Sequence, residues 1–358
     1  MQDLNNIVGR FSLEGRVSGV LPLGSGLIND TYKVTTEGDA PDYVLQRINN
    51  AVFRDVDLLQ HNIEAVTRHI RAKLMAADET DIDRKVLRFI PLKTSPKTYW
   101  TDGQTYWRIS VFIKDSFTYD TVNPKYSAFA GEAFGNFEAM LADIPDTIWE
   151  TIPDFHNMEL RLRQLDEAAA ADPAGRLGGV RDILAEMDSM REDMCLAERL
   201  FREGKLPKRI CHCDTKVSNM LFDAEGRPLC VIDLDTTMPG FVFSDFGDFM
   251  RTAGSTMPED DPSFEKVALR KEIFEPFARG YIHGATFLTP TEKENLPYGV
   301  LRFSYMQAVR FFADYLNGDT YYKIQFPEHN LVRTRNQMAL LHSQLDNFDY
   351  MNNYIARL

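Results

Sequence analysis

The chain has 358 residues, of which 44% are hydrophobic and 26% charged, and its formal net charge is −13 at pH 7. This is the composition of an ordinary globular protein, and the length exceeds the usual size of one core, so we expect two lobes. The negative charge argues against nucleic acid or an anionic membrane as a partner, because such partners are normally met by clustered Lys and Arg. Small molecules are the expected partners.

The sequence carries no targeting or membrane signal that we recognise. No apolar run approaches the ~18–20 residues that span a bilayer, and the opening MQDLNNIVGRF lacks the charged-then-apolar order of a signal peptide. The cysteines fit a reducing compartment, and their spacing suits zinc poorly: Cys195, Cys211, Cys213 and Cys230. We therefore expect a cytoplasmic protein without disulfides, as a monomer or weak homodimer.

Strand patterns dominate residues 1–115. Runs rich in β-branched and aromatic residues, bounded by turn residues, lie at 16–24, 27–36, 42–49, 97–102 and 105–113. Between the third and fourth runs, apolar residues recur at helical spacing: Leu58, Ile63, Val66, Ile70 and Leu74. The pattern predicts a small antiparallel sheet with one main helix.

Long helical patterns follow in residues 116–358. They lie at 132–144, 158–171, 184–201, 264–282 and 336–351. The clear strand patterns here are 219–223 and 228–235, on either side of the turn AEGR. The fold class expected is α+β, with a small β-rich lobe over 1–115 and a larger, mostly helical lobe over 116–358.

Four polar residues cluster around those two short strands. His212, Asp214 and Asn219 lie in HCDTKVSN, and Asp233 follows in VIDLD. An amide and a carboxylate can share a hard cation, while a second carboxylate can take a proton from a hydroxyl. That is the set phosphoryl transfer requires, since the protein mainly positions groups and neutralises charge. Taken singly, each residue could instead form a turn or a helix cap.

A short glycine motif precedes the second predicted strand. Gly24, Ser25 and Gly26 lie in LPLGSGLINDTYKV. Glycines at such a turn let backbone N–H groups approach phosphates, and ordinary hairpins use them too.

These motifs together resemble the aminoglycoside phosphotransferase and choline kinase superfamily, which has the protein-kinase-like fold. The resemblance rests on HCDTKVSN, on VIDLDTTMPG and on the later aspartates of SDFGD. It implies Asp214 as the catalytic base, Asn219 and Asp233 as Mg²⁺ ligands, and His212 as a structural residue. It also implies ATP and Mg²⁺ as cofactors, with 1–115 as the nucleotide-binding lobe and 116–358 as the catalytic and substrate-binding lobe.

The third strand departs from the kinase pattern. Its phosphate-binding lysine falls on Gln46, with Arg47 beside it, and alternation along a strand lets only one of the two face the nucleotide. In-register alignment favours Gln46, and Glu64 of the following helix is the expected pairing residue. Phe112 and Ile113, where the lobes meet, complete the expected nucleotide-binding residues.

A narrower resemblance is to the N-acetylhexosamine 1-kinases, and it covers most of the chain. It rests on GLINDTYKVTT, YVLQRIN, IPDFHN, HCDTKVSNML, AVRFFADYLNGDTYY and FPEHNLVRTR. It implies transfer from ATP to the anomeric hydroxyl of N-acetylglucosamine or N-acetylgalactosamine, with Arg310 and Tyr321 holding the sugar. An alternative for Arg310 is an ion pair with Asp314, four residues on in a helix.

Two alternatives for the whole protein remain open at this point. One is a kinase of another small alcohol, such as an aminoglycoside, choline or homoserine. The other is a nucleotide-binding pseudokinase, which the missing lysine at Gln46 keeps in consideration although Asp214 and both expected metal ligands are present.

Overall fold

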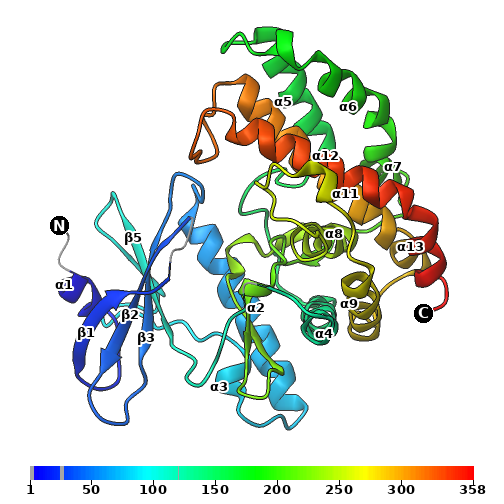
Figure 1. Ribbon diagram of the computed structural model, residues 1–358. Helices are drawn as coiled ribbons and strands as arrows, with labels where there is room; N and C mark the ends of the chain where they lie inside the picture. Colours follow the sequence, from blue (N-terminus) through cyan, green and yellow to red (C-terminus); the bar gives the residue numbers. More distant parts are fainter. Residues whose placement is uncertain (1–3, 25–27, 120) are drawn as a thin grey trace. The chain divides into compact units, whose positions relative to one another are not determined.

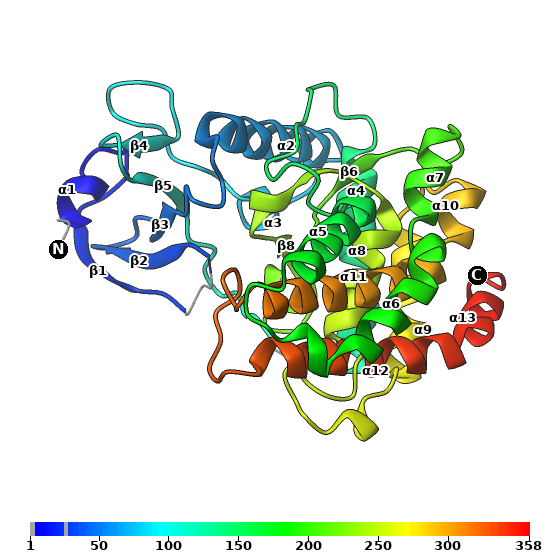
Figure 2. The same ribbon diagram turned by 90° about the horizontal axis from the view of Figure 1, so that it is seen from above.

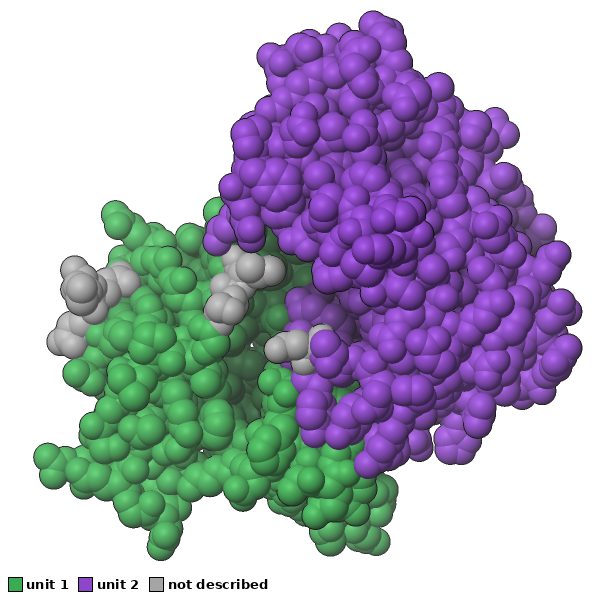
Figure 3. Space-filling model, viewed as in Figure 1, with its two compact units in different colours: residues 1–118, 143–153, 220–238 green, residues 119–142, 154–219, 239–358 purple. Residues whose placement is uncertain are grey.

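The computed structural model describes residues 4–24, 28–119 and 121–358 (Figure 1). The chain divides into two compact units, which Figure 3 colours separately. Unit 1 comprises Met1–Thr118, Asp143–Pro153 and Met220–Met238, and unit 2 comprises Tyr119–Ala142, Asp154–Asn219 and Pro239–Leu358. Two short segments from beyond residue 115 thus belong to the β-rich unit. Whether function divides at the predicted boundary after residue 115 stays a prediction.

Unit 1 is built on a five-stranded antiparallel sheet in the order β1-β2-β3-β5-β4. Its strands are β1 Val17–Pro22, β2 Asp30–Thr36, β3 Tyr43–Ile48, β4 Tyr99–Thr101 and β5 Tyr106–Val111. The unit also holds α1 Leu4–Val8, α2 Val56–Ala76, α3 Ile82–Lys85 and a hairpin of β7 Met220–Phe222 and β8 Pro228–Val231. All five strands and the main helix predicted for 1–115 are present.

The two faces of this sheet have different environments. One face forms an apolar core with α1, in which Tyr43 and Leu45 of β3 pack with Trp107 and Ile109 of β5. Because side chains alternate along a strand, the intervening Gln46 points to the other face. That second face carries a polar network, which α2 joins through its own side chains.

Unit 2 is helical. Its helices are α4 Pro124–Leu141, α5 Met158–Ala171, α6 Arg181–Met194, α7 Leu196–Arg202, α8 Val242–Thr252, α9 Lys271–Gly284, α10 Pro290–Glu294, α11 Leu296–Leu316, α12 His329–Asp346 and α13 Phe348–Ile355. Strands β6 Arg209–Cys211 and β9 Met238–Gly240 pair with one another. In both ribbon views α11 runs beside α5 and α12 (Figures 1 and 2). With its antiparallel sheet and its larger helical part, the predicted α+β fold class is confirmed.

Two of these helices meet backbone to backbone. A Cβ on Gly131 of α4 would lie 2.2 Å from the carbonyl oxygen of Phe277, and one on Gly280 of α9 would lie 2.2 Å from that of Ala128. Only glycine permits so close an approach. This close packing against α9 fixes the position of α4, the helix that carries Glu138.

The central helix α11 escaped the sequence patterns because it has no exposed face. All 21 of its residues are described, and all but Arg310 are buried. A helix buried on nearly all sides has no polar face that would mark an amphipathic period. No helix in the described part of the chain is long and apolar enough to cross a membrane.

Candidate active site

Asp214 and Asn219 come together in unit 2, in the loop between β6 and β7. Asn219 donates through Nδ2 to the backbone oxygen of Asp214 at 2.9 Å and to its Oδ2 at 3.0 Å. Lys216 Nζ lies 2.8 Å from the same Oδ2. Burial alone would raise the pKa of Asp214, but Lys216, His212 and the Asn219 hydrogen bond outweigh it and lower the pKa below its usual value. Asp214 is therefore an ionised acceptor at neutral pH.

Asp245 of α8 anchors the first residues of this loop. Its carboxylate accepts the backbone N–H groups of His212 at 2.6 Å and of Cys213 at 2.9 Å. Cys213 has φ 62°, a left-handed backbone conformation that residues other than glycine rarely adopt. The hydrogen bonds from Asp245 stabilise this unfavourable conformation. Cys213, for which sequence analysis offered no role, thus forms the sharp turn directly before Asp214.

A second buried acid lies beside Asp245. Burial raises the pKa of Asp245 to about 6, and burial together with the charge of Asp245 raises the pKa of Glu138 well above its usual value. Glu138 accepts a hydrogen bond from the Tyr281 hydroxyl at 2.6 Å. Because two neighbouring buried carboxyl groups disfavour the state in which both are ionised, the pair retains a proton.

His212 has the environment of a structural residue. It is fully buried, and its ring meets the edges of Phe134 at 5.7 Å and Phe137 at 5.9 Å between ring centroids. Its Nδ1 accepts the backbone N–H of Asp214 at 3.3 Å.

All four cysteines are free thiols.

Asn219 and Asp233, the two predicted metal ligands, lie in different units and are described separately. Asn219 is 5% exposed and both of its printed bonds use Nδ2, so its Oδ1 meets no donor in the described part of the chain. Asp233, in unit 1, is exposed and has φ 60° and ψ 56°, so it lies beyond the end of β8 rather than on the strand, as sequence analysis had placed it. Carboxylate and amide oxygens are among the ligands that Mg²⁺ takes in proteins, so the two residue types suit the predicted role, which stays a prediction.

Of the predicted glycine loop, only Gly24 is described. It has φ 70°, and a Cβ there would meet no atom within 4 Å. The backbone N–H of the preceding residue, Leu23, donates to the carbonyl oxygen of Thr31 at 2.9 Å. Ser25 and Gly26 lie outside the described residues.

Gln46 and Arg47 point to opposite faces of the sheet, as alternation predicts. Arg47 forms an exposed ion pair with Asp30 at 2.6 Å. Gln46 accepts a hydrogen bond from Arg108 Nε at 3.0 Å, directly across from it on β5. A cation does lie beside Gln46, and it comes from the neighbouring strand.

Arg108 was missed by sequence analysis. It is 2% exposed and lies at the centre of a buried network, in which its guanidinium meets Asp235 at 2.6 Å and Gln60 of α2 at 3.4 Å. Glu64 bonds to Thr98, which in turn receives a bond from Gln60. Glu64 therefore does not pair with Gln46 directly. The available signal was Arg108 itself, a lone charge in an otherwise apolar strand.

The predicted residues Phe112 and Ile113 directly follow β5 in unit 1. The Phe112 ring lies under Lys33 Nζ, 4.1 Å from its centroid, and its backbone N–H donates to the carbonyl oxygen of Asp42 at 2.8 Å. Ile113 is buried, and its carbonyl oxygen accepts the Ser116 hydroxyl at 2.7 Å. Their part in nucleotide binding stays a prediction.

Arg310 is the one residue of α11 that is not buried. Its guanidinium carbon lies 5.3 Å from the centroid of the Phe155 ring, 6.0 Å from Tyr321 and 5.6 Å from Tyr322. The alternative pairing with Asp314 is wrong, because Arg310 donates instead to Gln307 at 3.1 Å.

Asp314 has a different role, which is to hold the loop that carries Tyr321. Its carboxylate accepts the backbone N–H groups of Thr320, Tyr321 and Tyr322 at 2.8–2.9 Å. Asn330 of α12 donates to the same carboxylate at 2.9 Å. Tyr321 is thereby presented on a fixed loop with 66% of its surface exposed.

A second arginine lies near Arg310. Arg161 of α5 donates to the carbonyl oxygen of Phe155 and, at 2.9 Å, to Gln164. Burial and the charge of Arg310 lower the pKa of Arg161 to about 10. In the described part of the chain no carboxylate forms an ion pair with either guanidinium, so this surface carries two positive charges.

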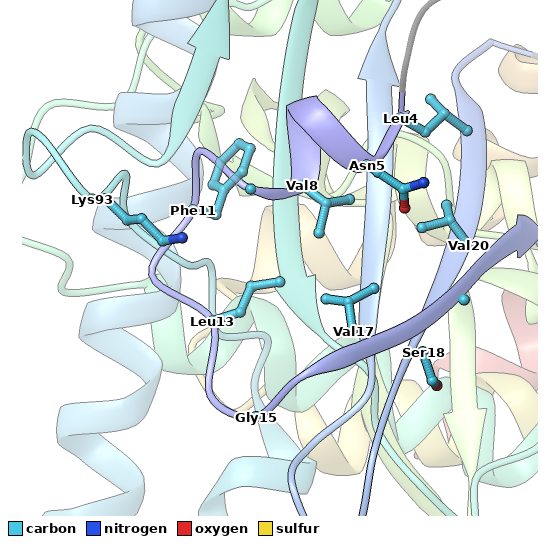
Figure 4. A pocket seen from close by; sticks show the side chains of 12 residues that line it. Leu4, Asn5, Val8, Phe11, Leu13, Gly15, Val17, Ser18, Val20 and Lys93 are labelled. Atoms are coloured by element: carbon cyan, nitrogen blue, oxygen red, sulfur yellow. The ribbon is translucent and has the colours of Figure 1, made fainter.

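A surface groove lies elsewhere in unit 1. It has a volume of about 680 Å³ and is lined by residues of α1, of β1 and of the segment between them, together with Lys93 (Figure 4). Val8, Phe11, Val17 and Val20 are among its lining residues. None of the predicted site residues that the structure describes lines it.

Solved structures share this fold. An aminoglycoside phosphotransferase from Alicyclobacillus acidocaldarius matches with a TM-score of 0.63 at 12% identity, over 100% of this chain and 98% of that one. A choline kinase from Cryptosporidium parvum matches with a TM-score of 0.57 at 12% identity, over 95% and 93%. A spectinomycin phosphotransferase solved with ADP and spectinomycin matches with a TM-score of 0.53 at 13% identity, over 99% and 97%.

The sequence itself matches a family model. Residues 19–285 fit the model of the phosphotransferase enzyme family, which the expected superfamily resemblance had anticipated. That span includes the glycine motif, Gln46, the catalytic loop and Asp233, and it covers well over half of the chain. This chain is a member of the phosphotransferase enzyme family.

Proposed function

We propose that this phosphotransferase uses ATP and Mg²⁺ to phosphorylate the anomeric 1-hydroxyl of an N-acetylhexosamine, GlcNAc or GalNAc, giving the sugar 1-phosphate and ADP. Nucleotide use is supported by the ADP in the spectinomycin phosphotransferase of the same fold. The acceptor is supported by the sequence resemblance and by the charge of the surface around Arg310.

That charge is the observation that carries the acceptor class. Arg310 and Arg161 have no carboxylate partner in the described part of unit 2. Arg310 lies among the aromatic rings of Phe155, Tyr321 and Tyr322, and Arg161 donates to the backbone oxygen of Phe155. Two guanidinium groups repel choline or an aminoglycoside, which are cations. Their donors suit the hydroxyl and acetamide oxygens of a neutral sugar.

In this proposal Asp214 orients the sugar hydroxyl and accepts its proton, for which its low pKa keeps it ionised. Lys216 and Asn219 fix the rotamer of the carboxylate through their bonds to Oδ2. Asn219 Oδ1 and the Asp233 carboxylate would hold Mg²⁺, which neutralises phosphate charge when bound.

The remaining predicted residues are assigned to the two substrates. The turn at Gly24–Gly26 would supply backbone donors to phosphates, and Gln46 a neutral donor. Phe112 and Ile113 would contact the nucleotide base, and Glu64 would support the network behind Gln46. Arg310 and Tyr321 would hold the sugar.

The test is ADP release measured side by side with GlcNAc, GalNAc, choline and kanamycin as acceptors. We expect release with a hexosamine and only background release with the two cationic acceptors. ADP release with choline or kanamycin, but with neither hexosamine, would assign the protein to another branch of the family. Nucleotide binding without release in any arm would leave a binding protein.

A variant then tests the acceptor surface. Arg310→Leu should raise KM for the hexosamine about 10–100-fold, the equivalent of one charge-assisted hydrogen bond, and leave KM for ATP unchanged. Arg163→Leu, which removes an exposed arginine from the same helix as Arg161, is the matched control and should change neither constant. Equal effects of the two variants would count against the assignment.

A further inference from the structure

Asp235 is a buried acid of unit 1 whose partners come from three other segments of the chain. It is 2% exposed, and its Oδ1 lies 2.6 Å from Arg108 while its Oδ2 accepts Asn29 Nδ2 at 2.7 Å. Its backbone oxygen accepts the hydroxyl of Thr151 at 2.8 Å. The strand pattern 228–235 included Asp235, but the residue lies in a short 3₁₀ turn, Leu234–Thr236, beyond the end of β8.

The partners of Asp235 come from segments that flank the expected nucleotide site. Asn29 directly precedes β2, and its Oδ1 accepts the backbone N–H of Asn49 at the end of β3. Arg108 lies on β5. The Asp235 carboxylate therefore ties together the start of β2 and the middle of β5, and its backbone oxygen adds the segment 143–153. This junction lies two residues after Asp233.

Arg108 also orients Gln46. An arginine has only donors, so the side-chain oxygen of Gln46 must face it, and the NH₂ group must point away. The Gln46 nitrogen has one long contact within unit 1, to Thr31 Oγ1 at 3.5 Å. Its N–H donors remain available to an anion such as a phosphate oxygen.

We propose that Asp235 is a positioning residue for the metal and the nucleotide. Through Arg108 and Asn29 it fixes the strained turn at Asp233 and sets the amide of Gln46 as a donor. Asp233 then presents its carboxylate to Mg²⁺ without a conformational search, and Asp235 itself touches neither substrate nor metal. This inference rests on the proposed use of Mg²⁺ and ATP, and it does not depend on the identity of the acceptor.

The experiment measures ADP binding by the full chain over a series of Mg²⁺ concentrations, with thermal unfolding recorded for each variant. Asp235→Asn should raise the Mg²⁺ concentration for half-maximal ADP binding about 10–100-fold, as loss of a group that orients a metal ligand commonly does. Asp30→Asn breaks the exposed pair with Arg47 on the same sheet and should leave that concentration unchanged.

A double variant separates positioning from stability. In Arg108→Met/Asp235→Leu no buried charge is left alone, and such replacements often retain stability. We expect its Tm near that of the unaltered protein and its Mg²⁺ requirement still raised. Recovery of both Tm and Mg²⁺ requirement would show that the pair is structural only and would overturn the inference.

A milder change covers the case in which both of those variants fail to fold. Thr151→Val keeps the shape of the side chain and removes only its bond to the Asp235 backbone. It should raise the Mg²⁺ requirement severalfold with little change in Tm, and an unchanged requirement would contradict the inference. MgADP binding without hexosamine turnover would defeat the proposed acceptor alone, whereas absence of MgADP binding would defeat both proposals.

Discussion

Asp235 in unit 1 and Asp245 in unit 2 are both buried aspartates that anchor a functional loop, and their charges are balanced in opposite ways. Asp235 faces a cation, Arg108, at 2.6 Å. Asp245 faces another acid, Glu138, and the pKa of each is raised, mainly by burial. One loop therefore depends on an ion pair and the other on a retained proton. The two anchors should respond differently to mutation and to pH.

Removal of the cation from unit 1 should have the largest effect on stability. Arg108→Met leaves the Asp235 carboxylate buried and uncompensated, which typically costs about 3–5 kcal/mol of unfolding free energy. Urea unfolding at pH 7 measures it. The exposed partner of Asp30 supplies the control, because Arg47→Met should cost at most about 1 kcal/mol. Equal costs would mean that burial of the Arg108 pair has no energetic weight.

A third carboxylate, Asp214, keeps its charge and should matter for turnover rather than for stability. Asp214→Asn should lower kcat by about 10²–10³, since a positioned base commonly contributes that much. MgADP affinity, measured by titration, should stay within a few fold. A kcat that does not change would assign the proton acceptor elsewhere.

Substitution of Asp245 and of Glu138, the two buried acids of unit 2, should lower the free energy of unfolding by different amounts. Asp245→Asn removes the charge that receives the His212 and Cys213 N–H groups and should cost about 2–3 kcal/mol, the range for hydrogen bonds to a charged acceptor. Glu138→Gln preserves a neutral side chain of the same shape and should cost less than about 1 kcal/mol. The unfolding free energies of the two variants, compared at pH 6, give the result. If Glu138→Gln proved the more damaging, the proton would reside on Asp245.

The pH dependence of the unfolding free energy should be the smallest and most specific effect. Because the folded pKa values of Asp245 and Glu138 are raised, the folded state holds more protons than the unfolded chain above about pH 4, and their contribution to stability falls as pH rises through about 6. The groups facing this pair are Tyr281, Cys211, His212 and Glu292.

Glu138→Gln isolates that contribution. Relative to the unaltered protein, the variant should gain stability as pH rises from 5 to 8, by at most about 1.4 kcal/mol per pH unit, which is the worth of one proton. Paired unfolding curves at each pH measure the difference. A difference independent of pH would mean that Glu138 is already ionised in the folded state.

The strands and the main helix of unit 1 were predictable because their periods are local, and so were Asp214 and Asn219, which lie five residues apart and bond to each other. Gln46 could be assigned to a face by alternation alone. Helix α11 could not be found in this way, because a helix buried on all sides has no polar face to mark its period.

The sequence by itself determined the family and the α+β class, since motif spacing and hydrophobic period are properties of short segments. Only the tertiary structure decided which charges meet. Asp235 and Arg108 are far apart in sequence, and the 143–153 and 220–238 segments joined unit 1 through long-range contacts. Arg310 was predicted from the sequence, but that it is the one residue of α11 that is not buried became known only from the structure. Burial sets the energy of a charge, and burial is known only once the chain has folded.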